Sequence, residues 1–369
     1  MTVGIVGAGQ LGRMLALAGY PLGLDFLCLD PARDAPAGQV APLLTGAFTD
    51  RRLLAELARR CEVVTFDWEN VPVASLRSMQ RSVHGARIAP PAAALACGQD
   101  RVSEKRLFEK LGIPTTRWRA VDSCAELAAA LAAVGLPGVM KTRRLGYDGK
   151  GQAVVRTRAE AERAFARLGS APLLYEEWVP FDCEVSVIGA RGARGAMAIY
   201  PLCGNVHGAG ILRITCAPYG PNRWQELAAR YLKRVLTHFR YRGILTIEFF
   251  VRGDRLIANE MAPRVHNSGH WTIEGAVTSQ FENHLRAILG LPLGSTRALG
   301  HSAMINLIGR IPPRAWLLAL PGVHLHDYGK RPRPGRKVGH CTIVEPTAAR
   351  RDARARLLAA RLAAGVRIP

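Results

Sequence analysis

Two apolar runs, ILTIEFFV and RLIANEMA, constrain the fold of this chain more than any other stretch. The tripeptide RGD at 252–254 joins them, which predicts an antiparallel hairpin. Such pairing would set Glu248 and Glu260 side by side, and two carboxylates repel unless a cation such as Mg²⁺ with a nucleotide polyphosphate lies between them. Two solvated acids would be the simpler interpretation. The polar turn that follows, PRVHNSGHW, favours a metal-nucleotide site instead.

Length and composition limit the classes of protein to which the chain can belong. Its 369 residues predict two or three domains, and 49% hydrophobic with 21% charged residues is typical of a soluble globular protein. Apolar runs are too short for a bilayer, and a strand begins by Val3 without a basic leader, so we expect neither a membrane span nor a signal peptide. The eight cysteines form no C-x-x-C pair, which predicts reduced thiols and a cytoplasmic protein.

The net charge of +21 raises the question of nucleic-acid binding. Arginine is spread through the chain together with abundant alanine, however, and only the segment 330–337 concentrates cations in one loop. A small anionic substrate explains that loop as well as nucleic acid does. We therefore expect small-molecule substrates, with neither nucleic acid nor a membrane as partner. A nucleic-acid-binding protein would instead show a steep salt dependence of duplex binding.

A glycine-rich turn near the N-terminus has the spacing of a dinucleotide-binding fingerprint. Gly7, Gly9 and Gly12 lie between a strand-like run and a helix-like run, and Asp30 ends the next strand-like run. Glycines permit a tight turn, and free N–H groups at a helix start attract an anion of any kind. The turn alone leaves a nicotinamide cofactor and another phosphate-bearing ligand equally open. An NAD-binding dehydrogenase therefore stays as an alternative of a different class.

Two acids, Asp67 and Glu69, follow a further apolar strand, EVVTF, at the position where open α/β sheets bind ligands. A helix cap or a surface turn is the simpler alternative for them. The Pro- and Ala-rich connection at 88–94 predicts a domain boundary. The helix expected after it carries Arg101 and Lys105, for which the sequence alone favours contact with water over contact with a phosphate.

The segment VMKTRRLGYDGKGQAVV predicts a phosphate-binding element. A strand ends at Lys141, and the glycine-rich loop 146–152 precedes the next strand. Backbone amides of such a loop can fold over phosphates, while a strand-borne lysine supplies a fixed point charge. The spacing is not that of a P-loop, and an ordinary glycine hairpin is the alternative.

A strand-to-linker crossing follows in the segment PLLYEEWVPFDCEVSVIG. Glu176 and Glu177 offer the hydrogen-bond acceptors that adenine N6 and ribose hydroxyls need, and Trp178 and Val179 offer an apolar wall. His207 comes later, in what we expect to be a glycine-rich loop, and a single histidine is usually structural.

The order of these elements resembles the ATP-grasp fold, in which two α+β lobes hold ATP between them. Within that superfamily the chain resembles the N5-carboxyaminoimidazole ribonucleotide synthetases of purine biosynthesis. The motifs that carry this resemblance include GAGQLGRML, ENVP, GYDGKGQ, EVSVIGARG, NEMAPRVHNSGHWT, MINLIG and RPGRKVGH. The resemblance implies an α/β and α+β chain with a Rossmann-like (pre-ATP-grasp) domain at 1–95, an ATP-grasp domain at 96–295 with a mobile lid at about 118–182, and a small C-terminal domain at 296–369.

The same resemblance implies a role for each site residue. The expected ATP-binding residues are Arg101, Lys141, Gly146, Tyr147, Asp148, Gly149, Lys150, Gly151, Gln152, Glu176, Glu177, Trp178, Val179, Glu184, His207, Asn259 and Glu260. The expected substrate-binding residues are Gln10, Leu11, Glu69, Arg264, His266, Asn267, Ser268, Lys330, Arg336 and Lys337. Glu248 and Glu260 are expected to bind Mg²⁺, and Asp148, Lys330 and Arg336 to act in catalysis. Relatives commonly read FEFENVP where this chain reads FDWENVP, so Asp67 stands in place of a glutamate that is one methylene longer.

The implied reaction is ATP-dependent carboxylation of 5-aminoimidazole ribonucleotide with bicarbonate, through carboxyphosphate or CO2, with release of ADP and phosphate. ATP and Mg²⁺, with Mn²⁺ as a substitute, are the implied cofactors, and a homodimer is the implied assembly. The alternative within the enzyme class is another ATP-grasp ligase, such as the formate-dependent glycinamide ribonucleotide transformylase. Asn267 argues against it, because that relative has an acid there.

Overall fold

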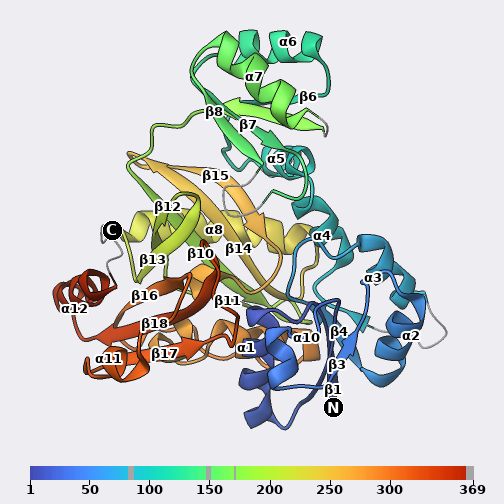
Figure 1. Cartoon of the computed structure of the whole chain (residues 1–369), viewed down its shortest axis with the longest axis vertical. Helices are drawn as coiled ribbons and strands as arrows, with labels where there is room; N and C mark the ends of the chain where they lie inside the picture. The colour runs from blue at the N-terminus through green and yellow to red at the C-terminus, as the bar shows by residue number, and fades with distance from the viewer. Residues whose placement is uncertain (82–86, 147–150, 170–171, 363–369) are drawn as a thin grey trace.

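Figure 1 presents the computed structural model of the chain, which describes residues 1–81, 87–146, 151–169 and 172–362. The described strands form three sheets, of five, nine and four strands. The chain is therefore mixed α/β, as predicted. Among the described helices, none combines the length and the apolar character that a membrane crossing needs.

The N-terminal sheet is parallel and has the strand order β3-β2-β1-β4-β5. Its strands are β1 (Thr2–Val6), β2 (Asp25–Asp30), β3 (Leu43–Thr45), β4 (Val63–Phe66) and β5 (Arg87–Ile88). Its helices are α1 (Gln10–Gly19), α2 (Arg51–Arg60) and α3 (Val73–Gln80), with short 3-10 turns at Tyr20–Leu22 and Pro36–Gln39. Alternating strands and helices explain this parallel arrangement, because each crossover must carry the chain back across the sheet.

The four-stranded sheet lies at the top of Figure 1 and has the order β6-β9-β7-β8. Its strands are β6 (Trp118–Val121), β7 (Gly138–Thr142), β8 (Gln152–Val155) and β9 (Leu173–Glu177), and its helices are α6 (Cys124–Val134) and α7 (Arg158–Leu168). These elements bury a separate hydrophobic cluster that includes Leu127, Met140 and Tyr175. The small sheet therefore has a core of its own.

The nine-stranded sheet has the order β15-β14-β10-β12-β13-β16-β18-β17, and β11 pairs with β10 outside this path. Its strands are β10 (Cys183–Arg191), β11 (Met197–Ile199), β12 (Cys203–Gly208), β13 (Ile211–Ala217), β14 (Gly243–Arg252), β15 (Arg255–Ala262), β16 (His301–Ile308), β17 (Val323–Asp327) and β18 (Lys337–Glu345). Because β13 pairs with β16, the C-terminal strands extend the sheet that begins at β10. The division of the chain at residue 296 stays a prediction.

Helices cover this large sheet and connect it to its neighbours. They are α4 (Ala92–Gly98), α5 (Arg101–Lys110), α8 (Asn222–His238), α9 (Thr272–Gly275), α10 (Gln280–Leu289), α11 (Arg314–Leu318) and α12 (Ala348–Arg361), with a 3-10 turn at Asn267–Gly269. The largest hydrophobic cluster joins Leu15 of α1 and Phe26 of β2 to Leu285 and Ile288 of α10. The N-terminal sheet is therefore packed against the large sheet through α1 and α10.

The predicted carboxylate hairpin is present. Strands β14 and β15 are antiparallel, and Glu248 lies directly opposite Glu260. The register shifts by one residue immediately after Glu248, between Glu248 and Phe249. A β-bulge of this kind re-aims side chains near functional sites.

Candidate active site

A cavity of about 720 Å³ opens where the three sheets meet. Many of the predicted site residues line it: Gln10, Leu11, Glu69, Arg101, Lys141, Gly146, Gln152, Glu176, Glu177, Trp178, Val179, Glu184, His207, Glu248, Asn259, Glu260, Arg264, His266, Asn267 and Lys337. Tyr147, Asp148, Gly149 and Lys150 lie outside the described residues. Lys330, Arg336, Ser268 and Gly151 are described but do not line the cavity.

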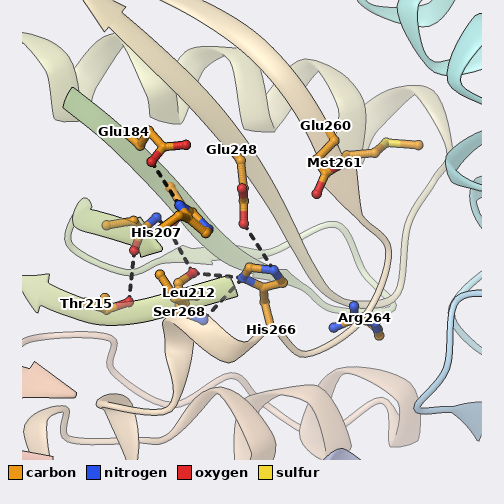
Figure 2. A network of polar contacts seen from close by, with 12 residues as sticks. Glu184, His207, Leu212, Thr215, Glu248, Glu260, Met261, Arg264, His266 and Ser268 are labelled. Carbon is orange, nitrogen blue, oxygen red and sulfur yellow. Dashed lines mark hydrogen bonds and ion pairs between the residues drawn. The ribbon is translucent and has the colours of Figure 1, made fainter. Parts of the chain in front are cut away.

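The carboxylate pair lines the cavity from β14 and β15, and Figure 2 shows both side chains. Burial raises the pKa of Glu248 to about 7; His207 opposes this rise and Glu260 adds to it. Desolvation in the cavity also raises the pKa of Glu260, but Arg101 and Lys141 lower it below its ordinary value overall. Arg101 Nη1 lies 3.1 Å from Glu260 Oε2. The two carboxylates therefore share one face and have different electrostatic surroundings.

His266 supports Glu248 from the polar turn after β15. Its Nε2 lies 3.3 Å from Glu248 Oε1, and a dashed line marks this contact in Figure 2. Burial lowers the pKa of His266 well below its ordinary value, and Arg264 lowers it further, so the ring is neutral. The backbone N–H of Ser268 donates to His266 Nδ1 at 3.3 Å, which leaves the ring proton on Nε2, facing Glu248. Ser268 itself is fully buried, so it orients His266 rather than entering the cavity.

His207 occupies β12 at a register shift, and the prediction of a glycine-rich loop at this position is wrong. Its Nδ1 lies 2.9 Å from Glu184 Oε2 (Figure 2). Burial lowers the pKa of His207, but the hydrogen bond to Glu184 and the charge of Glu248 raise it to about 9 overall. His207 is therefore a cation between acidic residues near neutral pH.

A buried charge cluster lies where β7 and β9 of the four-stranded sheet line the cavity. Glu176 on β9 pairs with Lys141, and its other oxygen lies 3.0 Å from Lys105 Nζ and accepts a 2.7 Å hydrogen bond from Thr116. Despite burial, the lysines hold the pKa of Glu176 far below its ordinary value. Both oxygens of this carboxylate are thus engaged within the protein. An adenine-binding role for Glu176 would have to use other atoms, and it stays a prediction.

The expectation that Arg101 and Lys105 face water is wrong. Lys105 is 2% exposed, and Arg101 points at Glu260 in the cavity. Lys105 and Thr116 bond to Glu176, which lines the cavity, and neither is among the predicted site residues. The i, i+4 spacing of Arg101 and Lys105, which places both on one helix face, was the available signal.

A further side of the cavity is formed by the N-terminal turn and the segment after β15. Arg264 Nη2 lies 2.8 Å from Glu69 Oε1, and Lys330 donates to the side-chain oxygen of Gln10. Asn267 lines the cavity, and within the described residues neither polar atom of its buried amide has a hydrogen-bond partner. That amide is free to bind a polar ligand.

The glycine turn is not arranged as a dinucleotide site. Gly12 N donates to Asp67 Oδ2 at 3.0 Å, and Ala8 N donates to Asp30 Oδ2 at 2.9 Å. A Cβ at Gly7, where φ is +92°, would lie 1.9 Å from Asp67 Oδ1. Carboxylates of the chain itself therefore occupy the places that a pyrophosphate would need. Burial raises the pKa of Asp67 to about 6, because the charged carboxylate is less favourable there than in water.

The candidate metal ligands fit Mg²⁺ by their chemistry. Among the described residues, no three His, Cys, Asp or Glu side chains form a ready-made metal cage. Mg²⁺ is usually held by one or two carboxylates together with substrate phosphates, and the pair on β14 and β15 provides that donor set.

The protein families that the chain matches show which class of protein it belongs to. The chain matches the ATP-grasp domain over residues 106–281, the ribonucleotide synthetase preATP-grasp domain over 1–99, and the phosphoribosylaminoimidazole carboxylase C-terminal domain over 302–354. Fold and site together make it an ATP-grasp ligase. More particularly, the chain belongs to the N5-carboxyaminoimidazole ribonucleotide synthase family.

Individual relatives support this assignment along the whole chain. The N5-carboxyaminoimidazole ribonucleotide synthase of Pseudomonas aeruginosa is 50% identical over 343 residues, which cover 93% of this chain and 94% of the relative. The crystal structure of the Thermus thermophilus synthetase has a TM-score of 0.94 at 49% identity, with both chains fully covered. The Aspergillus clavatus synthase, solved with ADP and 5-aminoimidazole ribonucleotide, has a TM-score of 0.91 at 30% identity, with 98% of each chain covered.

The protein is therefore an ATP-dependent carbon–nitrogen ligase of purine biosynthesis that carboxylates 5-aminoimidazole ribonucleotide. The comparisons agree with this interpretation rather than with the formate-dependent transformylase or the dehydrogenase. The occupied glycine turn gives the physical reason for setting the dehydrogenase aside.

Proposed function

We propose that the cavity holds MgATP between the four-stranded sheet and the β14–β15 hairpin, with the ribonucleotide on the side of the N-terminal turn. The observation that carries this proposal is the direct pairing of Glu248 with Glu260 inside the cavity. These two carboxylates would hold Mg²⁺, or Mn²⁺ in its place. When bound, the metal would neutralise charge that builds on the phosphate oxygens.

The cationic residues near this pair suit the phosphates of ATP. Lys141 is nearly buried, and Arg101 lies beside Glu260. Both can place positive charge near the γ-phosphate without a large rearrangement, and preorganised charge of this kind is the main catalytic resource for phosphoryl transfer. The remaining nucleotide contacts, including those of Glu184, His207 and the 146–152 loop, stay predictions.

The ribonucleotide and bicarbonate need different partners. A polar, anionic ligand would suit Arg264, which contacts Glu69, and Lys337, which lines the cavity. The buried amide of Asn267, whose polar atoms have no partner among the described residues, would suit it as well. Lys330 and Arg336 lie outside the cavity lining, on the basic loop. They would reach the 5'-phosphate, for which a guanidinium group offers a bidentate grip.

The reaction divides into two transfers. A bicarbonate oxygen attacks the γ-phosphorus, the bond to the bridging oxygen breaks, and ADP leaves with the electron pair, which gives carboxyphosphate. The exocyclic amine then attacks the carboxyl carbon or CO2 released from it, phosphate leaves, and the amine loses a proton. Positioning in a closed site accounts for most of the catalysis. A role for Asp148 in orienting or deprotonating the amine stays a prediction.

The setting of the enzyme is also a proposal. All eight cysteines are free, which fits a cytoplasmic location. We expect a homodimer, which light scattering coupled to size exclusion would test against a monomer.

A coupled assay tests the function directly. ADP formation is measured with ATP and Mg²⁺, with and without 5-aminoimidazole ribonucleotide and bicarbonate, and the carbamate product is identified by incorporation of labelled bicarbonate. We expect fast ADP release only when both acceptor substrates are present. Undiminished ADP release without bicarbonate, or release without label in the ribonucleotide, would contradict the proposal.

A further inference from the structure

Helix α5 lies between the four-stranded sheet and β15, as Figure 1 shows. Strand β15 is at the edge of the nine-stranded sheet, so its outward N–H and C=O groups need partners other than a neighbouring strand. The backbone of Pro114 pairs with Ala258, and two side chains of α5 bond to the residues that follow. Met261 N donates to Glu104 Oε1 at 2.6 Å, and Lys105 Nζ donates to Asn259 O at 3.2 Å.

Lys105 makes a second set of contacts in the opposite direction. Its ammonium group lies 3.0 Å from Glu176 Oε2 on β9, and both side chains are 2% exposed. Thr115 accepts a further 3.0 Å hydrogen bond from Lys105 and donates to Ala258 O at 2.7 Å. One buried cation thus bonds to both walls of the nucleotide cavity.

We propose that Lys105 is a positioning residue of the nucleotide site. It bonds both to Glu176, the carboxylate that pairs with Lys141, and to the main-chain oxygen of Asn259. It therefore fixes the separation between Lys141 on one wall and Glu260 on the other. This inference rests on the proposed binding of MgATP in the cavity.

The contact also has a consequence for ligand binding. Lys141 shares Glu176 with Lys105, so a phosphate that attracts Lys141 takes a cation away from this carboxylate. Removing the partner of a buried charge is strongly unfavourable. Lys105 stays beside Glu176 and compensates its charge, which lowers the cost of moving Lys141 towards the phosphate.

The principal variant is Lys105→Met, which keeps the aliphatic stem and removes the ammonium group. We expect the KM for ATP to rise about 30-fold, because a charged hydrogen bond of this kind is worth roughly 2 kcal/mol. The KM for the ribonucleotide should change less than about twofold, and Lys105→Arg should restore most of the loss. The matched control is Lys110→Met, the same change at an exposed lysine of α5, which should leave both constants unchanged.

A double-variant cycle separates positioning from simple charge compensation. If Lys105 only neutralised Glu176, Lys105→Met would have no effect on the KM for ATP in a Glu176→Gln background. A positioning role predicts that the double variant stays about tenfold worse than Glu176→Gln alone, because the contact with Asn259 O is still lost. Equal ATP constants for these two proteins would overturn the proposal.

Thr115→Val tests the same link if Lys105→Met fails to fold. The change is nearly isosteric and removes one hydroxyl that bonds Lys105 and Ala258. We expect about a threefold rise in the KM for ATP alone, and an unchanged constant would count against the proposal. Calorimetry measures the affinity for ATP without the ribonucleotide, so this test does not depend on carboxylation. A protein that binds MgATP but does not carboxylate the ribonucleotide would contradict the proposed reaction and leave the positioning role of Lys105 in place.

Discussion

The two sides of the cavity are built differently. On the side that we propose for the nucleotide, called the nucleotide side below, Glu176 and Lys105 are 2% exposed and engaged in several contacts each. On the side that we propose for the ribonucleotide, called the ribonucleotide side, the basic loop is held by exposed contacts, such as Arg331 with Asp34 at 3.3 Å. Buried ion pairs hold charged groups in place before a ligand binds, whereas exposed ion pairs contribute little to stability. The nucleotide side should therefore respond sharply to single changes, and the ribonucleotide side should depend on the ligand to complete it.

The largest expected effect is that of Glu248→Gln on the nucleotide side. The change keeps the size of the side chain and removes the charge that Mg²⁺ binding needs, so kcat should fall about 10³-fold. Steady-state ADP formation checks this, and the thermal midpoint serves as the control for folding. Normal turnover with a normal Mg²⁺ requirement would show that this side does not hold the metal.

Arg336→Ala should act on the ribonucleotide side. Its Nη1 donates only a 3.3 Å hydrogen bond to Arg331 O among the contacts described, so the guanidinium group is available for a phosphate. We expect the KM for 5-aminoimidazole ribonucleotide to rise about 30-fold, the value of a charged hydrogen bond, with little change in the KM for ATP. Equal effects on both substrates would remove the distinction between the two sides.

The pH dependence of metal binding probes the nucleotide side alone. Burial raises the pKa of Glu248 to about 7, so this carboxylate is protonated below that pH, and protons compete with Mg²⁺ for it. The apparent Mg²⁺ affinity should fall by up to about tenfold per unit of pH below 7 and level off above it. Titration of Mg²⁺ at several pH values in the presence of ATP measures this. In Glu248→Gln the slope should disappear, and a slope that persists would assign the titration to another group.

The smallest effect is expected at Gln39, which ties Gly329, the residue before the basic loop, to helix α1. Gln39 Nε2 donates to Gly329 O at 3.0 Å, and Arg13 Nη1 donates to Gln39 Oε1 at 3.1 Å. Gln39→Ala should raise the KM for the ribonucleotide about threefold, since an exposed hydrogen bond is worth about 0.5–1 kcal/mol. Gln80→Ala, at an exposed residue of α3, is the matched control. A change in the KM for ATP would show that the loop also organises the nucleotide side.

Much of the site followed from local sequence patterns. The hairpin with Glu248 opposite Glu260 was predicted from two apolar runs and a short turn, because the alternation of side chains in strands sets their register. The order of motifs predicted the ATP-grasp fold. Local patterns failed at Lys105 and at His207, since the spacing of residues along a chain does not state what packs against them.

The sequence by itself determined the class of fold, the carboxylate pair and the family, because these depend on residues close together in the chain or on motifs in a fixed order. Only the tertiary structure decided that Asp67 fills the glycine turn and that Lys105 bridges two sheets. Gly12 and Asp67 are separated by 55 positions in the sequence, and Lys105 and Asn259 by 154. Burial then decides the outcome, since a charge removed from water must find its partner among whatever groups the fold brings near it.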